Sequence, residues 1–373
     1  MKIGFDAKRI FHNRTGLGNY SRDLVRILES SFPQNDFFLY NPMQGKENLF
    51  VLPSKNVKEV RPYKAIFRFF YNLWRQFFII EDLKKDKIQI FHGLTGEIPY
   101  GLKKAGIRSV VTIHDLIFMR YPRFYSFFDR NIHRLKASYA VKNADIVVAV
   151  SQQTKDDIIA YFNIDPEKIR VIYQGCHDVF KQTFSLSDRE RIRQKFNLPE
   201  KYILNVGTIE ARKNILTGVK AIKDMDTHLV IVGSKTAYFK EVKTYISEHN
   251  LCAKVTFLEG VSTKELAMLY QSASLFIYPS LFEGFGIPIV EALFSGTPVI
   301  SSKGGCFAEA GGPSSIYVDP RSPEDLKGAI ELVLNNETQR TEMIQQGFLY
   351  ARKFTPEYIA NSFAEVYEGL IAI

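Results

Sequence analysis

The chain has 373 residues, more than one hydrophobic core usually supports, and 46% of them are hydrophobic, so length and composition predict two packed domains. Three widely spaced cysteines, Cys176, Cys252 and Cys306, fit neither a disulfide framework nor a metal knuckle, which favours a reducing, cytoplasmic setting. Residues 1–175 hold 28 Lys and Arg against 17 Asp and Glu. Such a basic first half indicates nucleic acid, a phospholipid surface or a phosphorylated substrate as partner, or else only a solvated basic face.

Short apolar runs alternate with longer amphipathic segments along the chain, which predicts an α/β fold with mostly parallel, helix-covered sheets. The start of the chain lacks the apolar stretch of a signal peptide, and no uncharged run reaches about 18 residues, so we expect neither secretion nor a membrane span. The expected strands are 2–6, 88–92, 109–114, 145–150, 170–173, 202–206, 228–232, 254–258, 275–278 and 298–301. Open parallel sheets bind ligands in the loops that follow the carboxyl ends of such strands.

Gly16 and Gly18 lie in the stretch Thr15-Gly-Leu-Gly-Asn-Tyr-Ser, after the first expected strand. The stretch resembles a dinucleotide-binding fingerprint, but its glycines come well after the strand and Ser21 stands where the third glycine is needed. No strand-terminal acid follows at the required distance either. We therefore discount a dinucleotide site here.

Residues 61–80 mix aromatic side chains with cations, as a helix on a membrane surface does. The alternative is a core helix with a basic outer face, and the helical spacing of Leu73, Phe77 and Ile80 favours that alternative. If the face is exposed instead, each Lys or Arg near anionic lipid contributes about 1 kcal/mol, and several together would suffice for peripheral attachment.

His114 stands at the carboxyl end of the strand expected over 109–114. A lone histidine is more often a satisfied structural residue, but this position favours a part in a binding site. We expect His114 to shape the site rather than to act as a base, with Asp115 available to orient its ring.

The boundary between the domains is expected near residue 176, where Gly175-Cys-His-Asp-Val-Phe gives way to a polar stretch at 182–193. We therefore predict a first domain over 1–175 and a second over 176–354. The segment 355–373 starts with Thr355 as an N-cap and Pro356 at the first helical position, and should form an amphipathic helix.

Arg212 and Lys213 follow a strand that ends near Gly207 and precede an expected helix. Adjacent cations are unfavourable near a helix N-terminus unless an anion binds there, because the helix dipole disfavours positive charge at that end. This pair therefore predicts an anion site.

The strongest pattern is the stretch 278–293, a strand, a glycine-containing loop and a helix. Gly284 and Gly286 let the backbone approach a ligand, and the helix N-terminus favours an anion such as pyrophosphate. Glu283 and Glu291 stand eight positions apart, and we expect the second in the first helical turn. In the plainer interpretation Glu291 only stabilises the helix dipole and Glu283 is a solvated loop residue.

Asp224-Met-Asp226 imitates a metal-binding Asp-x-Asp motif but precedes the strand expected over 228–232, at the wrong end of the sheet. No other cluster of acids or histidines has metal-ligand spacing. We therefore predict catalysis without a metal, with the charges of Arg212 and Lys213 in its place.

The glutamate pair, the Ala-Leu after Glu291 and the Gly-Thr-Pro-Val-Ile at 296–300 closely resemble the motif of glycosyltransferase family 4. The resemblance runs from the first strand to the final helix. It implies the GT-B fold: two facing doubly wound, Rossmann-like domains, with the C-terminal helix crossing back to pack on the first. The first domain would bind the acceptor and the second the nucleotide-sugar donor. One departure is Thr208, because many members carry arginine directly after the glycine, whereas here Arg212 stands beside Lys213.

The resemblance also implies a role for each candidate residue. Glu283 would contact hydroxyls of the donor sugar, and Glu291 would accept hydrogen bonds from the ribose. Arg212 and Lys213 would hold the diphosphate and stabilise the charge that develops as it leaves, and His114 would bind the donor sugar. Further contacts with the donor are implied for Gly16, Gly18, Gly207, Leu258, Val261, Gly284, Phe285, Gly286 and Ile287.

Members of this family retain anomeric configuration, which implies front-face displacement through an oxocarbenium-like state, with the departing phosphate able to deprotonate the acceptor hydroxyl. The stretches at 15–18, 91–94, 112–116 and 207–214 look most like bacterial mannosyltransferases of O-antigen and capsule assembly. GDP-mannose is therefore the leading donor and a UDP-sugar the alternative, with no bound cofactor. The acceptor would be a lipid-linked or oligosaccharide chain, which suits a cytoplasmic enzyme that attaches peripherally to the inner face of the plasma membrane.

Rival classes make different predictions. A non-catalytic subunit that binds nucleotide sugar or scaffolds a partner would be expected to have lost Glu283, Glu291, Arg212 or Lys213, yet all four are present. A phosphorolytic enzyme on a related fold would need a lysine-bound pyridoxal cofactor and a longer chain. A nucleic-acid binder would lose affinity steeply with salt and ignore nucleotide sugars, and we expect no nucleic-acid partner.

Overall fold

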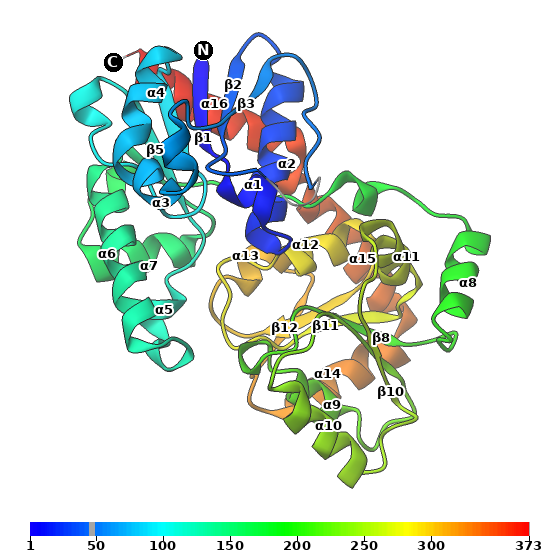
Figure 1. Cartoon of the computed structure of the whole chain (residues 1–373). Helices are drawn as coiled ribbons and strands as arrows, with labels where there is room; N and C mark the ends of the chain where they lie inside the picture. Colours follow the sequence, from blue (N-terminus) through cyan, green and yellow to red (C-terminus); the bar gives the residue numbers. More distant parts are fainter. Residues whose placement is uncertain (45–48, 373) are drawn as a thin grey trace. The chain divides into compact units, whose positions relative to one another are not determined.

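The computed structural model describes residues 1–44 and 49–372, which form two compact α/β units. Unit 1 comprises Met1–Gly175 together with Thr355–Ile373, and unit 2 comprises Cys176–Phe354. In each unit helices cover a parallel sheet, as Figure 1 shows. The α/β fold class is thereby confirmed.

The sheet of unit 1 has seven strands in the order β3-β2-β1-β4-β5-β6-β7, and all neighbouring strands are parallel. Because the chain winds one way from β1 and then returns to the other side of β1 with β4, the topological switch point lies between these two strands. The strands are β1 (Lys2–Asp6), β2 (Asp36–Tyr40), β3 (Val57–Val60), β4 (Ile90–Gly93), β5 (Arg108–Ile113), β6 (Ile146–Ala149) and β7 (Ile169–Val171).

The sheet of unit 2 has six strands in the order β10-β9-β8-β11-β12-β13, again all parallel. Its switch point lies between β8 and β11, so the loops that follow these two strands leave the same edge of the sheet next to each other. The strands are β8 (Ile203–Val206), β9 (Leu229–Val232), β10 (Val255–Leu258), β11 (Leu275–Tyr278), β12 (Val299–Ser302) and β13 (Ile316–Val318).

Helices follow most strands, as right-handed crossovers between parallel strands require. Those of unit 1 are α1 (Lys8–His12), α2 (Gly16–Ser31), α3 (Tyr71–Leu73), α4 (Ile79–Lys85), α5 (Ile117–Arg120), α6 (Phe127–Asn143), α7 (Gln152–Phe162) and α16 (Pro356–Ile371). Those of unit 2 are α8 (Leu186–Lys195), α9 (Ile215–Ala221), α10 (Phe239–Glu248), α11 (Thr263–Ser272), α12 (Ile287–Phe294), α13 (Phe307–Gly311), α14 (Pro323–Asn335) and α15 (Glu337–Ala351).

Helix α16 returns to unit 1 and completes its core. Ile359, Phe363 and Tyr367 are buried in one cluster with side chains of β1, β2 and α2. At the centre, the Tyr367 hydroxyl lies 2.7 Å from His92 Nδ1, while His92 Nε2 lies 2.8 Å from the Thr112 hydroxyl. The expected C-terminal helix is therefore present, and a polar contact fixes it to β4.

All ten expected strands exist, and the expected bounds of β1 and β11 agree with the structure. Three further strands, β2, β3 and β13, were not expected. β2 is an apolar run whose last four residues are buried, so its signal was readable. β3 has the sequence Val-Lys-Glu-Val and β13 only three residues, and both lie at sheet edges, where apolar patterning is weak.

The segment 61–80 is not the single core helix that the spacing of Leu73, Phe77 and Ile80 favoured. It forms a 3-10 turn, η1 (Ala65–Arg68), then α3, then a π-helical turn, η2 (Trp74–Phe78), before α4. The wider π turn shifts the register, so Trp74 and Ile79 become buried, while Leu73 and Phe77 are 49% and 51% exposed. The core interpretation is therefore wrong for Leu73 and Phe77.

We predict that Tyr367→Phe lowers the free energy of unfolding of unit 1 by about 1–2 kcal/mol, because a buried ring nitrogen of His92 loses its partner. Trp74, the only tryptophan, is fully buried in unit 1, so its fluorescence during urea denaturation reports on this unit. Tyr358→Phe is the matched control, since Tyr358 lies on the same helix but is half exposed. Equal losses in both variants would contradict the role given to the His92 contact.

Candidate functional site

The switch point of unit 2 brings two loops together. One runs from Gly207, at the end of β8, to Asn214 before α9, and the other from Pro279, after β11, to Gly286 at the start of α12. The backbone N–H of Leu281 donates to the carbonyl of Arg212 at 2.8 Å, which ties the loops to each other. Ligands bind at this position in open parallel sheets.

A buried carboxylate lies between two cations in these loops. Glu283 Oε1 is 2.7 Å from Lys213 Nζ, and Glu283 Oε2 is 2.7 Å from Arg212 Nη1. Arg212 also donates to the carbonyl of Phe282 at 2.8 Å and contacts Glu210 at 2.6 Å. The structure thus brings together three of the residues that the sequence selected as catalytic, although Glu283 lies 70 positions from Lys213 in the chain.

The local charges determine the protonation of Glu283. Burial alone would raise its pKa, but Lys213 and Arg212 lower the pKa to about 2. The side chain is therefore a carboxylate at neutral pH. In turn, Glu283 raises the pKa of Arg212, although burial opposes this.

This geometry changes the argument made from the Arg212–Lys213 pair. The pair was taken to require a bound anion, yet the protein itself supplies one in Glu283, with Glu210 as a second partner for Arg212. Neighbouring cations alone therefore did not establish a ligand site. Glu283 is also not the solvated loop residue of the plainer interpretation, because it is buried.

Tyr278 is a site residue that the sequence analysis did not single out. Its hydroxyl accepts a hydrogen bond from Lys213 Nζ at 2.7 Å, and the same ammonium group lies 5.0 Å from the centre of the ring. The side chain is fully buried at the end of β11. A tyrosine, with its hydroxyl, as the last residue of the otherwise non-polar strand Leu-Phe-Ile-Tyr was the available signal.

Two glycines shape the loops. Gly207 has φ +150°, and the carbonyl oxygen of Gly207 lies only 1.9 Å from where a Cβ at Gly233 would stand, so the ends of β8 and β9 approach closely. Gly286 has φ +121° and precedes α12, where a Cβ would crowd Ile289. The loop glycine at the helix start is thus required by the backbone itself.

Cys306 contacts the backbone of the loop that follows β11. Its thiol lies 2.9 Å from the carbonyl of Phe285 and 3.3 Å from that of Glu283, and the side chain is fully buried. In the sequence, nothing distinguishes this cysteine from the other two. A thiol that donates to two loop carbonyls helps to fix the backbone on either side of Gly284.

Glu291 is the fifth residue of α12, so it does not lie in the first turn as expected. Its Oε2 accepts a hydrogen bond from the Tyr270 hydroxyl at 3.0 Å, and the Tyr270 hydroxyl also lies 3.2 Å from the carbonyl of Pro288. The side chain of Glu291 is partly exposed. Its orientation is therefore fixed by α11, and it does not act on the dipole of the first turn.

The remaining donor-site candidates of unit 2 lie at the same edge of the sheet. Leu258 ends β10 and accepts the N–H of Gly233 at 3.0 Å, and Val261 follows in the next loop. Phe285 is buried against Phe354, so its side chain has a core role. Ile287 is the first residue of α12.

In unit 1, Gly16 and Gly18 begin α2 after β1 and α1. A Cβ at Gly18 would stand 2.0 Å from the carbonyl oxygen of Asn13, whereas a Cβ at Gly16 would meet nothing within 4 Å. Arg22 holds this turn by donating to the carbonyls of Ile10 and Asn13 at 2.9 and 2.8 Å. Gly18 is therefore needed for the fold, while the space at Gly16 is open.

The ring of His114 is held on both sides. Nε2 lies 2.9 Å from the carbonyl of Leu94, and Nδ1 lies 2.8 Å from the side-chain amide of Gln174. Asp115 was expected to orient the ring, but its carboxylate accepts the N–H of Ile117 at 3.1 Å, and Gln174 is the partner that orients Nδ1. Burial lowers the pKa of His114 to about 4, so the ring is neutral.

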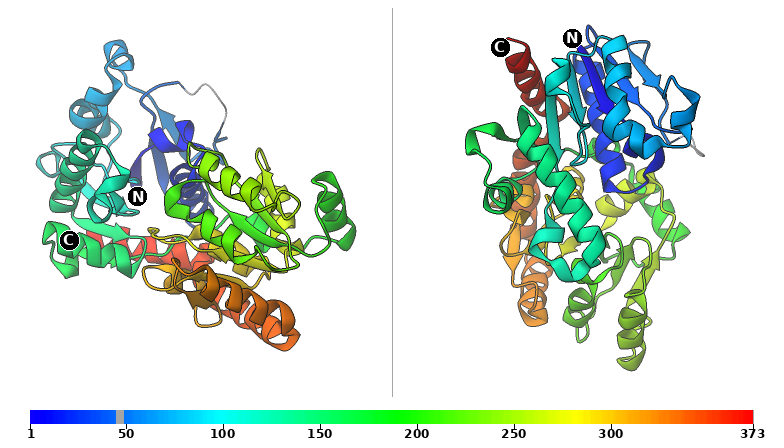
Figure 2. Two further views of the ribbon diagram at one scale, coloured as in Figure 1. Left: turned by 90° about the horizontal axis from the view of Figure 1, so that it is seen from below. Right: turned by 60° about the vertical axis from the view of Figure 1, so that its left-hand side comes forward.

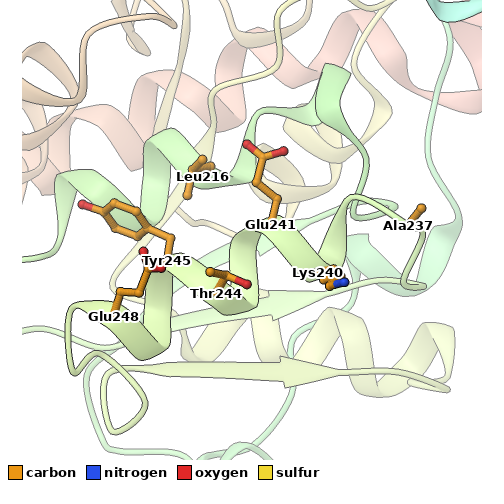
Figure 3. A pocket seen from close by; sticks show the side chains of 7 residues that line it. All are labelled: Leu216, Ala237, Lys240, Glu241, Thr244, Tyr245 and Glu248. Atoms are coloured by element: carbon orange, nitrogen blue, oxygen red, sulfur yellow. The ribbon is translucent and has the colours of Figure 1, made fainter.

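A metal cluster, a membrane-spanning helix and a separate pocket are three other features that could bear on function. Within residues 1–44 and 49–372, no group of three or more His, Cys, Asp or Glu side chains could hold a metal ion. Asp224 and Asp226 are exposed and precede β9, so they lie at the amino end of the sheet. No helix of the described residues is long and apolar enough to cross a bilayer. A surface pocket of about 520 Å³, shown in Figure 3, lies at α9 and α10 and contains none of the candidate residues.

Comparison with known proteins identifies both units. The family model described as Glycosyltransferase Family 4 matches residues 16–178, and that described as Glycosyl transferases group 1 matches residues 188–349. The O-antigen chain mannosyltransferase RfbU of Salmonella typhimurium is 35% identical over 59% of this chain and 59% of its own length. The O-antigen chain mannosyltransferase B of Escherichia coli is 25% identical over 99% of this chain and 100% of its own.

Solved structures share the fold over the whole chain. Sucrose-phosphate synthase from Thermosynechococcus elongatus has a TM-score of 0.81 at 22% identity, covering 100% of this chain and 99% of its own. HepE of Anabaena, in complex with UDP, has a TM-score of 0.77 at 18% identity, covering 99% and 100%. The fold is therefore that of the GT-B glycosyltransferases.

We predict that Glu283→Gln destabilises unit 2 by about 3 kcal/mol, because two buried cations lose their common carboxylate. Hydrogen exchange of peptides covering β8 and β11 measures this opening locally. Glu210→Gln is the matched control: it touches the same Arg212 but is more exposed, so less than about 1 kcal/mol is expected. A Glu283 variant no less protected than the Glu210 variant would disprove the assignment.

We also predict that unit 1 loses stability as the pH falls. Burial lowers the pKa of His92 to about 3 and that of His114 to about 4. Both rings are neutral when folded, while the unfolded chain takes up protons near pH 6.5, so each histidine costs about 1.4 kcal/mol per pH unit below that value. Urea midpoints from Trp74 fluorescence between pH 7 and 5 should show this slope.

His114→Gln should reduce the dependence of the free energy of unfolding on pH by the contribution of one proton. His133→Gln, at an exposed position on α6, is the control. An unchanged slope in the His114 variant would show that His114 does not titrate as the burial implies.

Proposed function

The chain belongs to the glycosyltransferases of family 4 and group 1, and we propose that it transfers mannose from GDP-mannose to a lipid-linked oligosaccharide during O-antigen or capsule assembly. The names of the two O-antigen mannosyltransferases to which it is similar support both the sugar and the pathway. In this proposal unit 2 binds the donor and unit 1 the acceptor.

The observation that carries the proposal is the charge cluster of Glu283, Arg212 and Lys213 at the switch point of unit 2. Two fixed cations at this edge would attract the donor diphosphate and stabilise the negative charge that it gains as the sugar departs. Because Glu283 already orients both cations, they would need little rearrangement during the reaction. Glu283 would exchange part of these contacts for hydroxyls of the sugar.

The other candidates take roles consistent with their surroundings. Glu291, held by Tyr270, would accept hydrogen bonds from the ribose. Backbone N–H groups between Gly284 and Ile287, at the start of α12, would face the sugar and phosphates. Since both nitrogens of His114 are occupied and the ring is neutral, His114 would contribute shape and ring contact to the sugar and not proton transfer.

Retention of anomeric configuration and independence of metal are part of the proposal. No residue of the cluster is free to act as a strong base, because Glu283 pairs with two cations and has a pKa of about 2. This favours removal of the acceptor proton by the departing phosphate. The cations Arg212 and Lys213 would supply the charge that a divalent ion supplies elsewhere.

A second candidate uses a UDP-sugar with the same residues. HepE of Anabaena was solved in complex with UDP and with UDP-glucose, which makes a uridine nucleotide a reasonable alternative. A non-catalytic scaffold is a weaker alternative, because the four charged residues are present and held by specific contacts. In either transferase version the enzyme would work in the cytoplasm, at the inner face of the plasma membrane.

We predict that GDP stabilises the protein in a thermal-shift panel of GDP, UDP, ADP and dTDP, with and without a metal chelator. A nucleotide at about 100 times its dissociation constant should stabilise unit 2 by about 2.7 kcal/mol. Glu291→Ala should remove the response, because the ribose loses its acceptor, while Glu241→Ala on exposed α10 is the control and should keep it. A response to UDP alone would instead select the UDP-sugar alternative.

Transfer itself is tested with GDP-[14C]mannose and a membrane extract that supplies acceptors, followed by digestion of the product with α- and β-mannosidases. Release by the α-mannosidase and activity in the presence of the chelator are expected for a retaining, metal-independent enzyme. No nucleotide response and no transfer would leave the scaffold interpretation as the better account.

A further inference from the structure

Two segments of unit 1 expose large apolar side chains that a folded domain normally covers. The first is 66–77, where Ile66, Phe69, Phe70, Leu73 and Phe77 are exposed, Phe69 by 82%. The second is α6, where Phe128 is 77% exposed. Among the described residues, six of the seven exposed phenylalanines lie in 69–78 and 127–128. Both segments can be followed in Figure 2, in light blue and teal.

The exposed residues of α6 form one stripe along the helix. Phe128, Ile132 and Leu135 recur at positions i, i+4 and i+7, and all three are more than half exposed. Tyr139 continues the stripe by one turn. The opposite face, with Ala137, Ala140 and Val141 buried, packs on the core. Tyr139 is partly buried against the same core cluster, whereas Phe128, Ile132 and Leu135 extend the apolar face onto the surface.

An aromatic stack joins the two segments. The ring of Phe77 lies parallel to that of Tyr100, with centroids 4.9 Å apart, and Tyr100 lies 4.0 Å from Tyr139 of α6. The N–H of Tyr100 also donates to the carbonyl of Gln76 at 2.7 Å. The stripe of α6 is therefore joined through Tyr139 and Tyr100 to Phe77. We call these residues, together with the exposed Ile66, Phe69, Phe70 and Leu73 of the first segment, the apolar strip.

Positive charge accompanies the apolar strip. The stretches 61–78, 100–108 and 120–136 contain 12 Lys and Arg and a single acid, Asp129, whereas the rest of residues 1–175 holds 16 of each sign. Five of the twelve cations form ion pairs with acids outside these stretches: Arg61 with Glu59, Lys64 with Glu81, Arg75 with Asp6, Arg120 with Asp157 and Lys136 with Glu97. Lys103, Lys104 and Arg134 are exposed. The exposed cations Lys103, Lys104 and Arg134 thus lie in the same stretches as the strip.

We propose that the apolar strip docks on an anionic lipid bilayer, with its aromatic and aliphatic tips in the headgroup region and its cations on the lipid phosphates. Aromatic and apolar tips interleaved with cations are the chemistry that inserts at such an interface. A second copy of the chain is disfavoured as the occupant, because a twofold contact through the strip would place two positively charged surfaces against each other. This surface is independent of the donor cluster in unit 2.

The test is flotation of the full-length chain with vesicles of phosphatidylcholine, with or without phosphatidylglycerol. The wild type should float with the anionic vesicles and much less with the neutral ones. Phe69→Ser/Phe128→Ser should lower the partition coefficient at least about tenfold, because both tips lose apolar contact. Lys103→Gln/Arg134→Gln should lower it by roughly 25-fold, at about fivefold per cation.

Matched controls come from unit 2. Phe348→Ser/Leu349→Ser removes two exposed apolar side chains, and Lys201→Gln/Lys243→Gln removes two exposed cations, and neither should change flotation. Melting curves and the nucleotide response of the strip variants should match the wild type, which separates loss of docking from misfolding. Failure of the nucleotide response in the wild type would count against the proposed reaction and leave the docking result unaffected.

Three results would overturn the proposal. The first is flotation of the strip variants equal to that of the wild type. The second is equal binding to neutral and anionic vesicles that does not respond to the loss of Lys103 and Arg134. The third is a wild-type dimer, in the absence of lipid, that becomes a monomer in the strip variants, because the strip would then be a contact between copies.

Discussion

Two adjacent cations and one buried carboxylate set the geometry of the candidate site in unit 2. Arg212 and Lys213 would repel each other where water is scarce, and Glu283 allows them to stay together because it contacts one with each oxygen. The arrangement depends on strand order: β8 and β11 pair directly, so loops far apart in the chain leave the sheet side by side. The contacts of Tyr278 and Cys306 then hold the cation and the loop backbone in place.

Features of this site that local sequence determines could be predicted, whereas those that arise from tertiary contacts could not. Local patterning was sufficient for β1, β11 and the helix that begins at Pro356, and the family motif selected Glu283, Arg212 and Lys213. The pairing of these three with one another was not predictable, because it arises from tertiary contact across 70 positions. For the same reason Tyr270 and Gln174, which orient Glu291 and His114, were missed.

In residues 1–175 the excess of basic over acidic residues could be read from the sequence, but the surface on which the cations lie could not. Counting charges gave the excess in residues 1–175, but helical spacing placed Leu73 and Phe77 in the core. The π-helical turn η2 breaks the regular α-helical spacing, because it adds a residue to the turn. The side chains after it are therefore rotated relative to those before it. Exposed aromatic side chains and cations therefore lie in the same segments. Neither the count of charged residues nor the helical spacing of apolar residues could predict this combination.

Helix α16 has a consequence for the order in which the protein is made. Unit 2 is continuous in sequence, but the core of unit 1 needs Ile359, Phe363 and Tyr367, which follow all of unit 2 in the chain. At typical translation rates of about 5–20 residues per second, unit 1 would wait tens of seconds for this helix after its own strands are synthesised. During that interval unit 2 can finish folding, while the apolar side chains of β1, β2 and α2 that α16 later covers stay exposed to water.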